Sequence, residues 1–362
     1  MLRAAKLLTC KSVRALGLNA LMARSPWRDK RLLILAYHGT SQDDEHLWDP
    51  SLYMPPALLR RRMQMIQQAG CHVLPLADAL RKLSSGELPP RSVAITFDDG
   101  TYDFYSQAFP ILQSFGFPVT VYVTTYYSDF NRPVYDPIAS YIIWKSQAPK
   151  IHWPEVLRSN DTYSLPQAKA FVRQRMHQYP GEEHLDGRQK DDLLAQLARR
   201  LGVDYDAITA KRIIHIMNAN EARELAGRGV DLQLHTHRHG VSCNREIFMR
   251  EIQDNRARLK AFGASAARHF CYPGGVHRPE FLPWLKECGI DSATTCELGL
   301  ASRSSESLLL PRMVDTSGVT DDEFAAWLSG VAHFLPKRPY VEAKGQFLEE
   351  RFGLQAAPSL NS

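Results

Sequence analysis

Short apolar runs alternate along this chain with segments in which apolar residues recur at helical spacing. Runs of four to seven residues predict strands at 32–38, 72–76, 92–97, 120–125, 231–236, 269–273 and 292–295. Helical spacing predicts helices between them, at 56–69, 104–115, 219–228, 244–262 and 279–288. This alternation indicates an α/β fold whose mostly parallel sheet is surrounded by helices and can close into a barrel.

The alternation stops between residues 128 and 215. This stretch is aromatic at first, around Tyr135 and Trp144, and then becomes polar with helical spacing. We interpret it as a helical insertion into one α/β domain that spans residues 32–336. Residues 337–362 are predicted to form a polar C-terminal tail.

Residues 1–31 form a separate basic segment. Its charged residues interrupt the apolar ones, unlike a secretory signal, in which the charges precede a continuous apolar run. Leu8, Val13, Leu16 and Leu21 instead indicate a basic amphipathic helix. Residues 1–24 of such a helix could lie on an anionic membrane face or pack on the domain. No run reaches the roughly 18 apolar residues that a membrane-spanning helix needs.

The composition limits which kinds of partner, and which cellular compartment, we expect for this protein. With 44% hydrophobic and 23% charged residues, the chain is predicted to be globular, with ample material for a core. The net charge of +5 comes without a Lys/Arg block or basic-aromatic interleaving, so we expect no nucleic-acid partner. Six cysteines without paired spacing favour reduced thiols, and hence a cytoplasmic protein that could lie at the inner membrane face. Export through an atypical signal is the alternative.

Two groups of polar residues follow predicted strands. Asp98 and Asp99 end the 92–97 run and precede Gly100, which by itself indicates a turn. His235 ends the 231–236 run, and His239 lies four positions later, a spacing that places both on one face of a helical turn. Because ends of parallel strands meet at one rim, both groups are expected to lie together there.

Two histidines and one carboxylate form a facial ligand set for a divalent metal, with positions left open for water and substrate. Only one of two adjacent carboxylates can comfortably reach such a metal. The other is then free to act as a general base on a metal-activated water.

The stretch TFDDG, followed by the H-[ST]-x-x-H pattern at His235–His239, resembles the polysaccharide deacetylase family (NodB homology, carbohydrate esterase family four). The stretches LLILAYHGT, GCHVLPLADAL, LPPRSVAITFDDG, AFPILQSFGFPVTVYVTT, FCYPGG and LLLPRMVD resemble the same family. The resemblance covers residues 32 to 315. It implies a distorted (β/α) barrel that uses a metal to remove an N-acetyl, or less often an O-acetyl, group from a sugar.

The resemblance also implies roles for individual residues. Asp98 would be the general base, and Thr236 would steady the metal loop. The metal, zinc with cobalt or nickel as alternatives, would be held by Asp99, His235 and His239. The backbone N–H near Gly274 would stabilise the oxyanion, beside a substrate contact at Tyr272 and Pro273.

The chain departs from the family pattern at two motifs. The motif R-P-P-Y-G reads Cys271-Tyr272-Pro273-Gly274-Gly275 here, so the arginine that orients the catalytic aspartate is missing at its usual place. Arg312 resembles an arginine that some subfamilies supply from a later strand. The Leu-x-His motif that carries the catalytic acid has no clear copy, and the histidines that could replace it are His38, His237 and His333.

The resemblance implies hydrolysis of an N-acetylated glycan of a bacterial surface polysaccharide or of its lipid-linked precursor. Two alternatives stay open: an amidohydrolase of the same fold acting on a small non-sugar amide, and a catalytically weak carbohydrate-binding relative. Trp144 and Trp153 could stack on sugar rings, although aromatic residues in an insertion more often form its own core.

Overall fold

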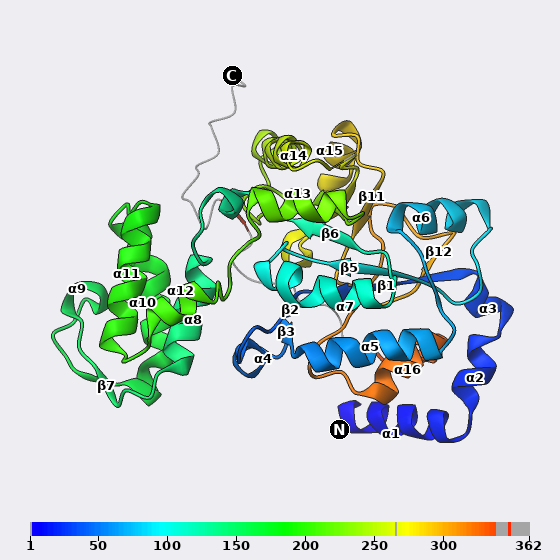
Figure 1. Ribbon diagram of the computed structural model, residues 1–362, viewed down its shortest axis with the longest axis horizontal. Helices are drawn as coiled ribbons and strands as arrows, with labels where there is room; N and C mark the ends of the chain where they lie inside the picture. The colour runs from blue at the N-terminus through cyan, green and yellow to red at the C-terminus, as the bar shows by residue number, and fades with distance from the viewer. Residues whose placement is uncertain (1, 265, 338–346, 349–362) are drawn as a thin grey trace.

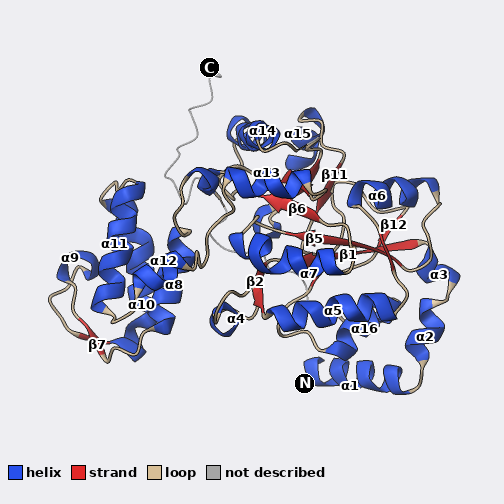
Figure 2. Ribbon diagram, in the orientation of Figure 1, coloured by secondary structure: helices blue, strands red, loops and turns tan. Residues whose placement is uncertain are grey.

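The computed structural model describes residues 2–264, 266–337, 347 and 348. A curled sheet of nine strands lies at the centre, with helices around it (Figures 1 and 2). Its main path runs β11-β10-β9-β6-β5-β1-β12, while β4 pairs with β5 and β13 with β1. The pairs are parallel except β1 with β12. The strands are β1 (Arg31–Tyr37), β4 (His72–Val73), β5 (Ser92–Phe97), β6 (Thr120–Val123), β9 (Asp231–Leu234), β10 (His269–Cys271), β11 (Ser292–Thr294), β12 (Ala301–Ser302) and β13 (Met313–Val314).

Residues 310–314 join the two ends of this sheet. Met313 and Val314 pair in parallel with β1, and Leu310 forms a parallel bridge with Thr294 of β11. The sheet therefore curls into a distorted barrel, as predicted. Since its parallel strands end at one rim, the residues that follow β1, β5, β9 and β10 gather there.

Alternate residues of the strands belong to two different apolar clusters, because successive side chains of a strand point to opposite faces of the sheet. Leu33 and Leu35 of β1 pack with the surrounding helices, whereas Leu32 and Ile34 belong to a cluster with Leu76 of α6. The helices of the barrel are α5 (Pro56–Gln68), α6 (Leu76–Ser85), α7 (Phe109–Ser114), α13 (Ala219–Gly227), α14 (Arg245–Ala261), α15 (Phe281–Glu287) and α16 (Asp321–Ser329). A π-helix, η1 (Phe104–Ala108), precedes α7, so the predicted helix at 104–115 starts with wider turns.

The predicted insertion is helical and lies beside the barrel in Figure 1. It contains α8 (Tyr135–Lys145), α9 (Pro154–Leu157), α10 (Leu165–Glu182), α11 (Gly187–Arg200), α12 (Tyr205–Ala210) and the hairpin of β7 (Lys150–Ile151) and β8 (Tyr163–Ser164). These elements share a core of their own. Trp153 is buried in it and Trp144 packs against it, so the core interpretation of these tryptophans is confirmed.

A short segment between β1 and α5 connects the barrel to the insertion. It holds β2 (Gly39–Thr40), α4 (Glu45–Trp48) and β3 (Tyr53–Met54). Tyr53 is buried in the insertion's core, and Trp48 packs against the same cluster. The remaining short helices are η2 (Tyr126–Asp129), η3 (Pro273–Gly275) and η4 (Val331–Phe334).

The N-terminal segment forms α1 (Leu2–Ala15), α2 (Leu18–Ala23) and α3 (Pro26–Asp29), which confirms a helical start. One face of α1 packs on the domain, because Cys10 is fully buried and Arg14 pairs with Asp322 at 2.8 Å. In the described part of the chain, no helix combines the length and apolar content that crossing a membrane requires.

Most of the predicted tail at 337–362 lies outside the described residues. Within it, Phe347 forms a bridge with Val241, and the buried Leu348 donates its backbone N–H to the Val241 carbonyl at 2.9 Å. At these two positions the chain contacts the domain, and the polar tail as a whole stays a prediction.

Candidate active site

Asp98 and Asp99 stand in a turn at the end of β5, but they point into different surroundings. Asp98 extends the pairing with β1, because its N–H donates to the Tyr37 carbonyl at 2.9 Å, and it is 2% exposed. Asp99 adopts a positive φ of 68°, and its side chain is 25% exposed. Gly100 follows with φ 72°, where an added Cβ would lie 2.7 Å from Val123. The turn therefore requires glycine and separates the two carboxylates.

Arg312, which immediately precedes β13, forms a bidentate ion pair with Asp98. Its Nη1 and Nη2 each lie 2.7 Å from one carboxylate oxygen, and the arginine side chain is fully buried. Nε donates to the Thr295 carbonyl at 2.9 Å, which fixes the plane of the guanidinium. Burial alone would raise the pKa of Asp98, but Arg312 outweighs it and lowers that pKa to about 2. Asp98 is thus held ionised, and Arg312 has the position predicted for it.

Cys271 occupies the place of the missing motif arginine. Arg312 Nη2 donates to its Sγ at 3.1 Å, and the thiol lies 3.5 Å from Asp98 Oδ2. The barrel brings β10 and residue 312 to the same carboxylate, so either position can supply the guanidinium. A thiol on β10 leaves room for the longer side chain that arrives from the other side.

His235 and His239 both face Asp99. Their Nε2 atoms lie 3.2 Å and 3.1 Å from Asp99 Oδ1. The spacing of four residues predicted this convergence for the wrong reason: residues 235–239 form no helical turn, and Thr236 and His239 have positive φ angles of 60° and 54°. The loop is closed by Thr236, whose Oγ1 accepts the Gly240 N–H at 3.0 Å, as its predicted role requires.

The ring of His235 is fixed by its surroundings. Nδ1 lies 2.9 Å from the Cys271 carbonyl, to which it can only donate, so Nε2 is the ring nitrogen that faces Asp99. The backbone N–H of His235 donates to the buried Asn255 of α14, whose amide also donates to the Val123 carbonyl and to Thr125 Oγ1. Sequence reasoning missed Asn255, because one polar residue inside a helix carries no signal of its contacts.

Asp99, His235 and His239 offer three ligand atoms that lie within 4.8 Å of one another. Burial would raise the pKa of Asp99, but the charge of His239 and the hydrogen bonds from both histidines hold it well below its usual range. One carboxylate and two imidazole nitrogens suit zinc and similar divalent metals. The donor set therefore fits the metal that the resemblance implies.

A second group, Asp98, His235 and Cys271, also brings three ligand atoms together. Arg312 contacts both the carboxylate and the thiol of this group. A permanent positive charge at that point repels a cation, so the Asp99 group is the better metal site.

His38, one of the three histidines considered for the acid, follows β1 and lies next to Asp98. Its Nε2 is 3.6 Å from Asp98 Oδ2, and its buried Nδ1 has no hydrogen-bond partner. The two other candidates for the acid have other contacts. His333 packs on Trp27 with ring centroids 5.1 Å apart, and His237 Nδ1 lies 2.9 Å from Thr125 Oγ1.

The predicted substrate and oxyanion residues lie in η3 and just before it. Tyr272 is buried and its hydroxyl donates to the Leu308 carbonyl at 3.0 Å, and Pro273 is buried as well. Packing and this hydrogen bond engage the Tyr272 side chain, and a substrate contact at Tyr272 and Pro273 stays a prediction. Gly274 has φ 56°, and its N–H stays a prediction as oxyanion donor.

A cavity of about 590 Å³ opens over Asp99 and His239. The segment between β1 and α5 supplies one wall, with Trp48, Leu52 and Tyr53. The insertion and the chain next to it supply the other. That wall includes Tyr127, Val134, Asp136, Pro137, His177, Ile214 and Ile216. Sequence reasoning placed the insertion but missed this role, because only the fold brings residues so far apart in the chain to one cavity.

Comparisons with known proteins agree with this geometry. The profile of the family described as polysaccharide deacetylase matches residues 85–293. The chain is 29% identical over 101 residues to poly-β-1,6-N-acetyl-D-glucosamine N-deacetylase of Escherichia coli K12, a match that covers 28% of this chain and 15% of that protein. A deacetylase of Streptococcus pyogenes, PplD, solved with acetate, superposes with a TM-score of 0.55 at 18% identity, covering 82% of this chain and 98% of that one. Since the family profile matches more than half of the chain, this protein belongs to the polysaccharide deacetylase family.

Proposed function

We propose that this protein is a metal-dependent hydrolase that removes the acetyl group from an N-acetylated amino sugar of a bacterial surface glycan or of its lipid-linked precursor. One observation carries the proposal: the adjacent carboxylates have separate partners. Asp99 faces two histidines, whereas Asp98 is paired with Arg312. A hydrolase that needs both a metal ligand and an ionised base requires this division. The name of the E. coli relative supports N-acetylglucosamine as the sugar.

Asp99, His235 and His239 would hold the metal, for which zinc is our first choice, with cobalt and nickel as alternatives. A divalent cation there would supply Lewis acidity, which polarises the acetyl carbonyl and lowers the pKa of a nearby water. His235 would present Nε2 to the metal, because its other nitrogen donates to the Cys271 carbonyl.

Asp98 accepts the proton of the attacking water while the new C–O bond forms. Arg312 keeps this carboxylate ionised and oriented through two hydrogen bonds. The backbone N–H of Gly274 donates to the oxyanion of the tetrahedral intermediate. As the C–N bond breaks, the sugar nitrogen takes a proton and acetate leaves.

We assign the delivery of that proton to His38. It lies beside Asp98, so the proton that Asp98 receives from water has a short route to the leaving nitrogen. The unpartnered Nδ1 leaves the ring free of a fixed hydrogen bond on that side. His237 and His333 are bound to other groups and are weaker candidates.

Release of acetate from a soluble N-acetylglucosamine oligomer, with and without a chelator, tests this proposal. We expect release that the chelator abolishes and that added zinc restores. Release from small non-sugar amides but from no sugar would favour the amidohydrolase alternative. Sugar binding without release of acetate would identify a weak carbohydrate-binding relative.

A further inference from the structure

The N-terminal segment combines an unusual charge with an unusual exposure of leucines. Residues 1–28 contain six Lys or Arg and no Asp or Glu, whereas residues 29–362 contain 38 basic and 39 acidic residues. The positive net charge of the whole chain therefore lies in its first 28 residues. The catalytic mechanism uses none of them.

Helix α1 has two different faces. Cys10 is fully buried against the domain, while Leu8, two positions away and hence on the opposite side of the helix, is 67% exposed. The chain then turns at Gly17, and the exposure of leucines continues through this turn into α2. Leu16 and Leu21 are each 73% exposed, and Leu18 is 42% exposed.

Few large apolar side chains elsewhere in the described part of the chain are so exposed. Of eight such residues, four are these leucines. Lys11 and Arg24 are exposed on the same segment. Leucines that face water cost free energy unless another apolar medium covers them, and basic residues beside them select an anionic one.

We propose that α1, the turn at Gly17 and α2 dock on the surface of a membrane rich in anionic phospholipid. The leucines enter the boundary between headgroups and acyl chains, and the basic side chains contact the headgroup phosphates. The segment lies on the surface and does not cross it. Charge complementarity favours a membrane over a second copy of this chain, because two copies would bring two such basic segments together.

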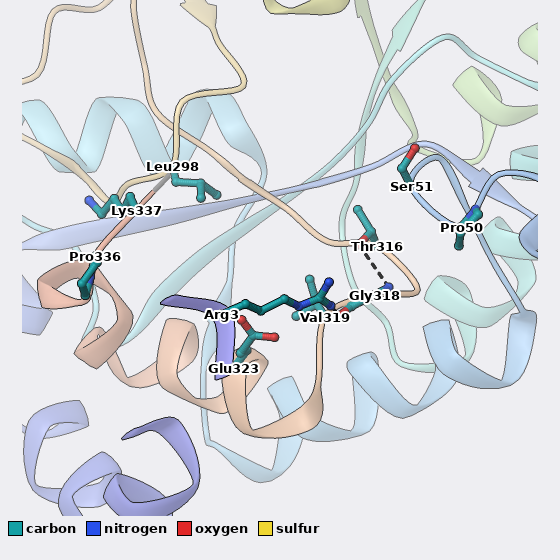
Figure 3. A pocket seen from close by; sticks show the side chains of 10 residues that line it. All are labelled: Arg3, Pro50, Ser51, Leu298, Thr316, Gly318, Val319, Glu323, Pro336 and Lys337. Carbon is teal, nitrogen blue, oxygen red and sulfur yellow. Dashed lines mark hydrogen bonds between the residues drawn. The ribbon is translucent and has the colours of Figure 1, made fainter. Parts of the chain in front are cut away.

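Helix α1 also lies near the segment that forms one wall of the catalytic cavity. Arg3 of α1 donates to the Gly318 carbonyl at 3.0 Å and lines a second cavity together with Pro50 and Ser51 (Figure 3). Those two residues belong to the segment that carries Leu52 of the catalytic cavity. Leu47 and Leu52 of this segment are exposed. Helix α1 and the segment that forms one wall of the catalytic cavity therefore line the same second cavity.

Co-sedimentation of the full chain with vesicles tests the proposal. One set of vesicles is phosphatidylcholine alone, and the other contains about 30% phosphatidylglycerol. We expect binding to the anionic vesicles only, weakened by about 0.5 M NaCl because salt screens exposed charges.

Two double variants separate charge from apolar contact, and a third is the matched control. We expect K11E/R24E and L16S/L21S each to weaken binding roughly tenfold or more. The control, R188E/R199E, reverses two exposed charges on α11 of the insertion and should bind as the original protein does. All three should keep their circular dichroism spectrum and their acetate release from a soluble oligomer, since none of these residues lies at the site.

The proposal is overturned if the original protein does not bind anionic vesicles, or if K11E/R24E binds them as well as the original does. It is also overturned if light scattering shows a dimer that L16S/L21S dissociates while vesicle binding is unaffected. Vesicle binding is measured without substrate, so failure of the proposed deacetylation would leave this test intact.

Discussion

Replacement of Arg312 by methionine tests the best-defined interaction of the site. The change removes the guanidinium but keeps an unbranched side chain, so Asp98 stays buried without its partner. Breaking a buried ion pair by removing one member costs about 3–5 kcal/mol. One pKa unit corresponds to about 1.4 kcal/mol, so the pKa of Asp98 should rise from about 2 to about 4–6.

The sign of the effect of pH on stability should then reverse. In the original protein the pKa of Asp98 lies below its unfolded value of about 3.9, so its contribution is present above that pH and is lost as the pH falls toward about 2. In R312M the folded pKa lies above the unfolded value. The ionised carboxylate then destabilises the fold at neutral pH, and part of the stability returns as the pH is lowered through the new pKa.

Urea unfolding between pH 3 and pH 8 would measure how the free energy of unfolding depends on pH. The pH dependence of kcat/KM for acetate release would be measured alongside it. We expect R312M to lose about 3–5 kcal/mol of unfolding free energy at pH 7 and to move the acidic limb of kcat/KM upward by about 2–4 units. The double variant D98N/R312M is the control, because it removes both charges and should recover most of the stability. If R312M matched the original protein in both measurements, the pair would not be what keeps Asp98 ionised.

Four further variants examine the other parts of the site. D98N should lower acetate release by about 10²–10⁴-fold with unchanged metal content by mass spectrometry, whereas H235A should lose the metal itself; bound metal in H235A would contradict the ligand assignment. H38Q should lower kcat with unchanged metal content and remove one limb of its pH profile; an unaltered profile would exclude His38 as the proton donor. N255A should lower the unfolding free energy by about 2–4 kcal/mol and weaken metal binding about tenfold, because the His235 N–H loses its acceptor; unchanged metal affinity would show that Asn255 supports only the fold.

The barrel was predictable because its strands are buried on both sides and read as continuous apolar runs. Strand β5 matches the predicted range of 92–97. Strands β1, β6 and β9 each begin within one residue of their own predicted starts. Strands β12 and β13 were missed, since two paired residues leave no period to detect. Helices α6 and α16 were also missed, although their apolar faces are buried in the structure.

The site was predictable where its residues stand at strand ends. It was unpredictable where the conformation of a loop determines which residues meet. Asp98, Asp99 and His235 follow strands directly, so the topology alone brings them to one rim. His239 reaches Asp99 through two residues with positive φ, a conformation that the spacing does not disclose. The walls of the cavity depend on how the insertion packs against Tyr53, which only the fold determines.

The pair of Arg312 and Asp98 also bears on whether this chain is an active enzyme or a catalytically weak carbohydrate-binding relative. Burying an arginine and an aspartate completely gains little stability over apolar residues of similar volume, so stability alone gives no reason for it. A protein that only binds sugar has no use for a carboxylate that is kept ionised behind a metal ligand. The missing motif arginine would support the weak relative only if the ion pair between an arginine and Asp98 were missing too. Because the guanidinium reaches Asp98 from residue 312 instead, with both oxygens at 2.7 Å, the interaction is complete and the departure in sequence is no argument for a relative that lacks activity.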